Sequence, residues 1–177
     1  MKTTLFSALA LAALSLTALA ATKPDQTATV ALGGKNITIK YSSPAVNGRA
    51  GKIFTKDGLI SGDDHYPVWR AGANNATVLH TDAALDLGGL SLAPGDYSLF
   101  VTIANPAAWE LIVNKQTGQQ GLEYDAKQDL GKVKMTMSKP PELVEQLIYT
   151  LTSTGGNKGV LKLSWENVAA SVNFTTK

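Results

Sequence analysis

The segment from Tyr66 to Asn75 contains the most chemically varied side chains in the chain. Its arginine, Arg70, is permanently charged and planar, so it can hold a carboxylate, a phosphate or a sulfated sugar through two parallel hydrogen bonds. Beside it, Trp69 offers a ring for stacking, and Asn74 offers an amide for ligand hydroxyls. These residue types predict a ligand site. In the alternative reading, Arg70 ties loop carbonyls together, Trp69 belongs to the core and Asn74 bonds to its own backbone.

A second arginine, Arg49, follows a segment that cannot continue a strand. Pro44 lacks the amide proton that a sheet ladder needs, and Asn47-Gly48 favours a turn. We therefore place Arg49 on a loop, from which it can meet Arg70 on one anion. The predicted ligand-binding residues are Arg70, Arg49, Trp69 and Asn74.

The composition gives little support to a metal site. The chain has no cysteine and only two histidines, His65 and His80, which excludes cysteine ligands and argues against a multi-histidine zinc site. Asp63, Asp64 and His65 form an acidic cluster beside an imidazole, but adjacent aspartates in an extended chain point in different directions. We interpret this cluster as a solvated loop and predict no metal and no cofactor.

No recognisable catalytic motif is present. The sequence has neither a Gly-x-Ser-x-Gly elbow nor a Ser-x-x-Lys motif, and its glutamates lie in unrelated contexts. In Trp109-Glu110 and Trp165-Glu166 we interpret the tryptophans as core residues and the acids as outward-facing. The sequence thus predicts no catalytic residue and favours a protein that is not an enzyme.

The N-terminal segment predicts export. Lys2 precedes an apolar run from Leu5 to Leu19, and the run closes on small residues at 18–20. This pattern is typical of a signal peptide cleaved after Ala20, and the run is too short and too rich in alanine for a membrane anchor. We expect a periplasmic or extracellular protein whose mature chain, residues 21–177, forms one domain without a membrane span. The formal net charge of +2, with scattered lysines, argues against a nucleic-acid partner.

Alternating apolar residues and frequent Gly and Pro turns predict an all-β fold. Gly33-Gly34 and Gly155-Gly156 separate alternating runs and are typical of hairpin turns. The segment at 141–146 has the alternative of beginning as a helical turn. We predict an antiparallel β-sandwich, or a flattened barrel, of about ten strands. The expected strands are 29–32, 36–41, 51–54, 76–80, 83–87, 90–92, 97–103, 109–114, 132–138, 143–152, 160–166 and 170–175.

Several segments together resemble a bacterial family known as domain of unknown function 2911. The resemblance covers nearly the whole mature chain. The residues that carry it are Tyr41-Ser42-Ser43-Pro44, Gly48-Arg49, Val68-Trp69-Arg70-Ala71-Gly72-Ala73-Asn74, Ala93-Pro94-Gly95-Asp96-Tyr97-Ser98-Leu99-Phe100, Trp109-Glu110-Leu111-Ile112-Val113-Asn114, Tyr124-Asp125 and Trp165-Glu166.

The resemblance implies export and a β-rich fold, and it carries no established activity. The chain also departs from the family pattern in two places. A longer insertion, Asp63-Asp64-His65-Tyr66-Pro67, stands where family members typically have a Pro-Tyr-Gly turn. Near Gly131-Lys132 the chain has lysine where members often have arginine.

We therefore expect an exported ligand-binding module that takes a small molecule or a glycan at a loop-built site around Arg70. A structural or interaction component of the cell envelope with a protein partner is the alternative. A hydrolase built on His65 and nearby acids is the third reading.

Overall fold

The computed structural model describes residues 23–177, and the predicted signal peptide lies outside this range. The described chain forms strands and two short 3-10 helices. The strands are β1 Lys23–Leu32, β2 Lys35–Ser43, β3 Val68–Trp69, β4 Ala73–Thr81, β5 Leu85–Leu87, β6 Leu90–Leu92, β7 Gly95–Thr102, β8 Glu110–Asn114, β9 Asp129–Lys134, β10 Thr136–Ser138, β11 Val144–Gly155, β12 Lys158–Glu166 and β13 Val168–Thr176. The helices are η1 Ile60–Gly62 and η2 Ala126–Gln128.

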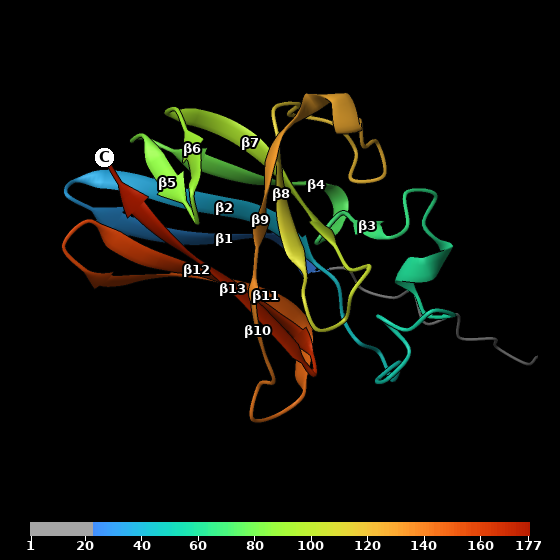
Figure 1. Ribbon diagram of the computed structural model, residues 1–177. Coiled ribbons are helices and arrows are strands. Elements are labelled where there is room, and N and C mark those ends of the chain that lie inside the picture. The colour runs from blue at the N-terminus through green and yellow to red at the C-terminus, as the bar shows by residue number, and fades with distance from the viewer. Residues whose placement is uncertain (1–22) are drawn as a thin grey trace, which may run out of the picture.

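The strands form two antiparallel sheets that lie one over the other (Figure 1). The seven-stranded sheet has the order β1-β2-β4-β7-β8-β9, with β3 paired to β7. The six-stranded sheet has the order β11-β12-β13-β5-β6, with β10 paired to β13. This architecture confirms the predicted β-sandwich and excludes the alternative of a barrel.

Both predicted glycine hairpins are present. Gly33 and Gly34 have φ angles of 57° and 75°, and they join β1 to β2 in a register that pairs Leu32 with Lys35. Positive φ at both turn positions is the geometry that matches the twist of the flanking strands, and glycine adopts it without a steric cost. The β11–β12 turn uses Gly155 and Gly156, with φ angles of 115° and 58°.

Strand β7 is covered on both faces, as its sequence pattern predicts. Leu99 and Val101 are fully buried between the two sheets. Phe100 points to the other face of the same strand, where it forms a small second core with Ala76 and Ile112. The loop that connects β8 to η2 covers this second core, because Gln119 O accepts a hydrogen bond from Ala76 N and Asn74 O accepts one from Gly121 N.

Two local predictions are wrong. The run at 132–138 is two strands, because the chain leaves the seven-stranded sheet after Lys134 and joins the six-stranded sheet at Thr136. Residues 51–54 form no strand. The strand predicted at 143–152 is present as β11, and the alternative of a helical turn at 141–146 does not occur. Alternation alone does not reveal a change of sheet, since the pattern of buried residues continues through it.

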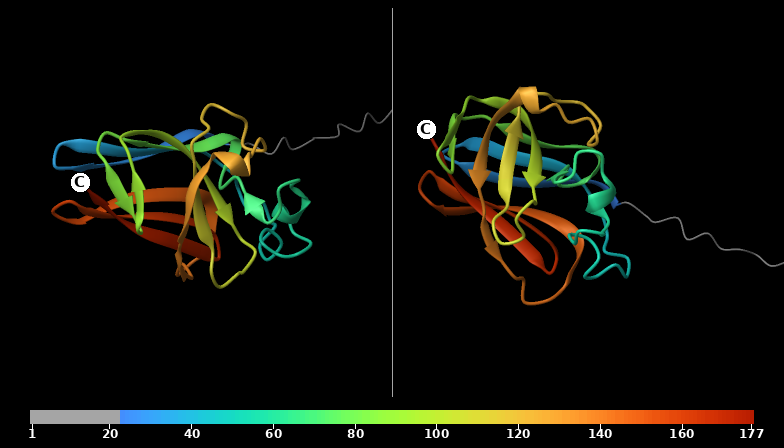
Figure 2. Two further views of the ribbon diagram at one scale, coloured as in Figure 1. Left: turned by 45° about the horizontal axis from the view of Figure 1, so that its top comes forward. Right: turned by 45° about the vertical axis from the view of Figure 1, so that its right-hand side comes forward.

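A long segment without strands, residues 44–67, lies at the end of the sandwich opposite the C-terminus (Figures 1 and 2). Phe54 anchors it, because its ring contacts Trp69, Trp109 and Trp165 at centroid distances of 5.4, 4.8 and 5.7 Å. These tryptophans come from β3, from the residue before β8 and from β12. The segment is therefore tied to both sheets.

Gly159 provides a test of the packing in the six-stranded sheet. A Cβ atom at this position would lie 2.4 Å from the Phe174 ring on the neighbouring strand. We expect Gly159→Ala to lower the free energy of unfolding by about 1–3 kcal/mol, the usual cost of overpacking. Urea denaturation measures this change. Gly62→Ala is the matched control, because nothing lies within 4 Å of its added Cβ atom. Equal stability of the two variants would contradict this packing.

Candidate functional site

Arg70 lies in a cavity of about 90 Å³ where β3 leads into β4. Its aliphatic stem packs against Gly121, where an added Cβ atom would lie 2.7 Å from Arg70 Cδ. The side chain is half-buried, yet its guanidinium group forms no hydrogen bond or ion pair with any residue from 23 to 177. The stem is therefore held by packing, while the charged head keeps its donors free.

Trp165 lines the same cavity and has an unpaired donor of its own. Its side chain is buried, with 1% of its surface exposed, and its Nε1 has no hydrogen-bond partner among the described residues. Such a donor normally finds an acceptor when it is buried. The carboxylate of Asp63 also lines the cavity but forms no ion pair with Arg70. The cavity thus contains the free guanidinium group of Arg70 and one acidic residue, and Trp165 in its wall has a buried donor that lacks an acceptor.

Trp69 forms a wall of this cavity as a core residue. It is 2% exposed, and its ring stacks on that of Trp165 with a centroid distance of 5.8 Å and an interplanar angle of 17°. Its ring also contacts Trp109 at 6.0 Å. Because other aromatic rings already contact Trp69, it gives the cavity a rigid apolar wall.

The other two predicted site residues lie outside the lining of this cavity. Arg49 binds its own loop: its Nε donates to Val46 O at 3.0 Å and its Nη2 donates to Ala45 O at 2.8 Å. Asn74 is exposed with a φ of 57°, and its side chain forms no hydrogen bond with the described residues. Of the four predicted residues, the structure brings together Arg70 and Trp69.

A larger cavity of about 600 Å³ lies on another side of the 44–67 segment and contains Glu166. The prediction that Glu166 faces outward is wrong, because its side chain is 5% exposed. Its Oε1 accepts a hydrogen bond from Gly51 N. Glu166 ends β12, and the Trp165–Val168 pair makes it the first of the two residues in the β12–β13 hairpin turn, where its φ is 56°. The alternation rule therefore does not give its direction.

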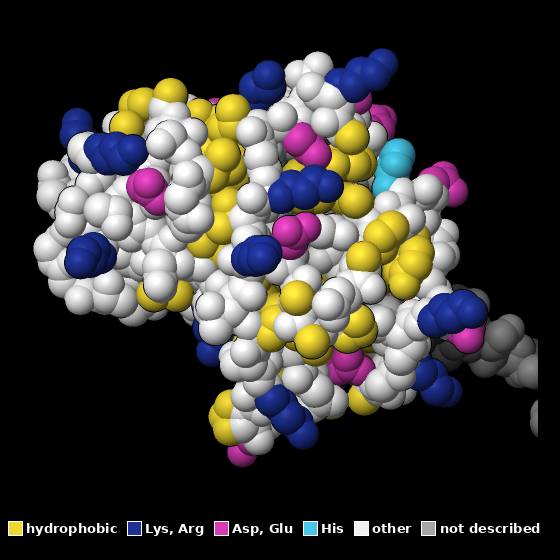
Figure 3. All heavy atoms as spheres, viewed as in Figure 1, with side chains coloured by type: hydrophobic (Ala, Val, Ile, Leu, Met, Phe, Trp, Pro, Cys, Tyr) yellow, Lys and Arg dark blue, Asp and Glu magenta, His cyan; other side chains and the backbone are white. Residues whose placement is uncertain are grey.

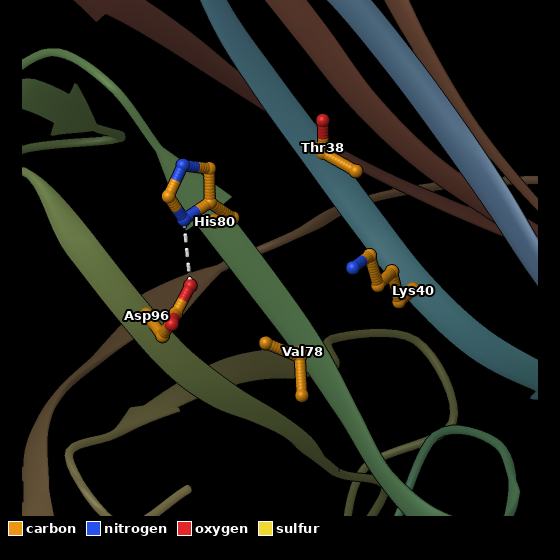
Figure 4. Close-up of a pocket in the computed structure, with 5 residues that line it drawn as sticks. All are labelled: Thr38, Lys40, Val78, His80 and Asp96. Carbon is orange, nitrogen blue, oxygen red and sulfur yellow. Dashed lines mark hydrogen bonds and ion pairs between the residues drawn. The ribbon is translucent and has the colours of Figure 1, made fainter.

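A third hollow, of about 470 Å³, lies on the outer face of the seven-stranded sheet. Figure 4 shows its residues standing on three neighbouring strands, with His80 pointing toward Asp96. His80 Nδ1 lies 2.6 Å from Asp96 Oδ1, and His80 Nε2 lies 3.1 Å from Asp82 Oδ1. The hydrogen bond with Asp96, followed by that with Asp82, raises the pKa of His80 above its ordinary value of 6.5.

We call His80 with its two carboxylate partners, Asp82 and Asp96, the histidine clamp. It was not predicted from the sequence. The i, i+2 spacing of His80 and Asp82 could have revealed half of it, since such residues share a face of a strand. Asp96 could not be found in this way. It meets His80 only because β4 and β7 pair in a register that sets the two residues opposite each other.

The described residues contain no grouping of metal ligands and no membrane-spanning helix. Between residues 23 and 177 there is no group of three or more His, Cys, Asp or Glu side chains that could hold a metal ion. His65 instead packs its ring against Tyr124 at a centroid distance of 5.6 Å. The same part of the chain has no helix long and apolar enough to cross a membrane.

A family model described as "Protein of unknown function (DUF2911)" matches residues 23–174. The chain belongs to this family. The resemblance noted from the sequence is thereby confirmed. Searches of curated proteins and of solved structures gave no match.

The segments through which this DUF2911 chain resembles its family meet in space. Pro44, Gly72 and Trp165 come from three such segments and line the Arg70 cavity together. Trp109, from a fourth, packs against Trp69 in its wall. Figure 3 shows acidic and basic side chains interspersed over the face of this DUF2911 domain seen in Figure 1, without a field of one sign.

The histidine clamp predicts a pH-dependent stability. Because the pKa of His80 is raised in the folded state, its contribution is complete below about pH 6.5 and is lost as the pH rises through the raised pKa. We expect His80→Gln to lower the unfolding free energy more at pH 5.5 than at pH 8.5, by a small amount because the side chains are exposed. Urea denaturation at both pH values measures this difference.

His65→Gln is the control for this experiment, since His65 forms no ion pair with a carboxylate of the described chain. It should leave the pH dependence of stability as in the unmodified protein. A pH dependence that is the same in His80→Gln and in the unmodified protein would contradict the role of the clamp.

Proposed function

We propose that this DUF2911 protein is an exported, non-catalytic ligand-binding domain that holds the acidic group of a small molecule or a glycan at Arg70. The observation that carries the proposal is the unpaired, half-buried guanidinium group of Arg70, which lines a cavity whose wall also includes buried Trp165. A buried donor without an acceptor costs about 1–3 kcal/mol, so an incoming acceptor oxygen gains affinity by relieving that cost.

The geometry of the cavity supports an acidic group as the buried part of the ligand. A planar guanidinium group binds carboxylate, phosphate or sulfate through two parallel hydrogen bonds. The volume of about 90 Å³ exceeds the roughly 10–15 Å³ that a water molecule needs, and it is smaller than the roughly 300 Å³ of the smallest typical ligand sites. One end of the ligand therefore enters, and the rest stays outside.

Export rests on residues 1–20. The basic start, apolar run and small-residue end predict delivery to the periplasm or to the exterior. A domain in that place meets free metabolites and glycans directly, which suits a binding role.

The hydrolase reading has less support from the geometry. Ser42 Oγ donates to Asp25 Oδ1 at 2.8 Å, and Ser43 Oγ donates to Leu147 O at 2.7 Å. Both serines are buried, and neither hydroxyl is bonded to a histidine that would activate it.

A specific observation favours an envelope interaction protein as the second candidate. Leu143 and Ile148 are 43% and 45% exposed, and both line a hollow around the start of β11, an edge strand of its sheet. Exposed apolar residues on a sheet edge suit contact with another protein. A partner that binds the unmodified protein and fails to bind Ile148→Asp would support this candidate.

Substitution of Arg70 tests the proposed site. We expect acetate, citrate, phosphate, sulfate or glucuronate, each at matched ionic strength, to raise the unfolding temperature of the unmodified protein. Arg70→Gln should abolish the rise, and Arg70→Lys should keep only part of it because an ammonium group lacks the planar fork. A ligand at 100 times its Kd stabilises by about 2.7 kcal/mol, which differential scanning calorimetry detects easily. An equal rise in Arg70→Gln would contradict the proposal.

Arg49 supplies the matched control arginine. Arg49→Gln loses two hydrogen bonds to carbonyl groups of its loop, so we expect it to lower the free energy of unfolding by about 1–3 kcal/mol. Arg70→Gln loses no hydrogen bond within the described chain and should cost less than about 0.5 kcal/mol. The response of Arg49→Gln to the anions should equal that of the unmodified protein. The opposite ranking in urea denaturation would show that Arg70 is the structural arginine.

A further inference from the structure

Glu166 occupies a position in the chain that is unfavourable for glutamate. It is a turn residue of the β12–β13 hairpin, and its φ of 56° lies in the left-handed region. Glycine adopts this conformation freely, whereas other residues are held there at a cost of about 1–2 kcal/mol. A glutamate at this position therefore requires an interaction of its side chain that offsets the cost.

Within the described chain, only one oxygen of the Glu166 carboxylate has a hydrogen-bond partner. Oε1 accepts a hydrogen bond from Gly51 N, and no ion pair with a cationic side chain is formed within residues 23–177. Lys56 is the one basic residue in the lining of the cavity, and its ammonium group is not within ion-pair distance of Glu166. Glu166 as a whole residue is 5% exposed, and a buried carboxylate without a cation is costly, so this position favours a positively charged partner.

The walls around Glu166 are mainly apolar. Phe54, Ile103, Pro106 and Val168 line the cavity, and the exposed ring of Tyr66 also borders it. Its volume of about 600 Å³ falls within the roughly 300–1,000 Å³ of typical small-molecule sites. In Figure 3, hydrophobic side chains gather at the lower centre and the right of the face, and in Figure 1 the 103–109 loop and the 44–67 segment lie there. An apolar cavity with one buried carboxylate and an accessible aromatic ring suits an organic cation.

We propose that this cavity is a second binding site, which takes an organic ammonium group with Glu166 as its counter-ion and Tyr66 as an aromatic wall. The negatively charged carboxylate oxygen that is not bonded to Gly51 lies next to the positively charged nitrogen. The apolar walls contact the methyl or methylene groups around that nitrogen. This site shares no lining residue with the Arg70 cavity and does not depend on the function proposed for it.

Binding of choline and n-butylammonium tests the site, with 3,3-dimethylbutan-1-ol as the uncharged analogue of choline. Isothermal titration calorimetry at constant ionic strength should show saturable binding of at least one of the two cations by the unmodified protein. We expect Glu166→Gln to weaken that binding by about tenfold or more, because a charged partner is lost. The uncharged alcohol should bind both proteins alike.

Glu166→Gln keeps an oxygen that can accept from Gly51 N, so the fold should survive, which circular dichroism checks. Glu142→Gln is the matched control, because Glu142 is exposed and does not line this cavity. If Glu166→Gln fails to fold, Tyr66→Leu replaces it and should weaken binding of the cation while leaving that of the alcohol unchanged. Absence of saturable cation binding, or equal cation binding in the variants and the unmodified protein, would overturn this proposal and leave that for Arg70 untouched.

Discussion

The packing of Phe54 among three tryptophans holds together the end of the molecule that contains the Arg70 and Glu166 cavities. Its ring lies between 4.8 and 5.7 Å from those of Trp69, Trp109 and Trp165, which belong to different parts of the two sheets. Aromatic pairs in such edge and tilted arrangements add about 0.5–1.5 kcal/mol each beyond the burial of their surface. The 44–67 segment has no strand before β3, so this contact fixes it against the sandwich together with hydrogen bonds such as that of Val46 N to Glu145 O.

The aromatic cluster also determines the positions of two charged residues, Arg70 and Glu166. Arg70 directly follows Trp69, and Glu166 directly follows Trp165, so each charged residue is attached to a rigid buried neighbour. Arg70 and Glu166 then line different cavities beside the same 44–67 segment. Neither charge is paired with another side chain of the described chain. The end of the sandwich therefore offers two preorganised groups of opposite charge on a common scaffold.

The two arginines that were predicted to bind a ligand, Arg49 and Arg70, make different contacts in the structure. Arg49 donates to carbonyl groups three and four residues before it, which is a local arrangement that a loop can make by itself. Arg70 has no such partner, because its stem lies against Gly121, which approaches from a loop far away in the sequence. Both residues look alike in the sequence, where an arginine beside glycine and small residues fits either role. The difference arises from which backbone happens to lie within reach of the side chain.

The sequence by itself determined the all-β class, most strands, the glycine hairpins and the burial of both faces of β7, because these follow from local alternation and backbone conformation. It also indicated Arg70 and Trp69 as neighbours at one site. Only the tertiary structure decided that the 132–138 run changes sheets, that Glu166 turns inward and that His80 meets Asp96. Each of these depends on strand register or on the direction of a turn, and those are set by contacts between residues distant in the chain.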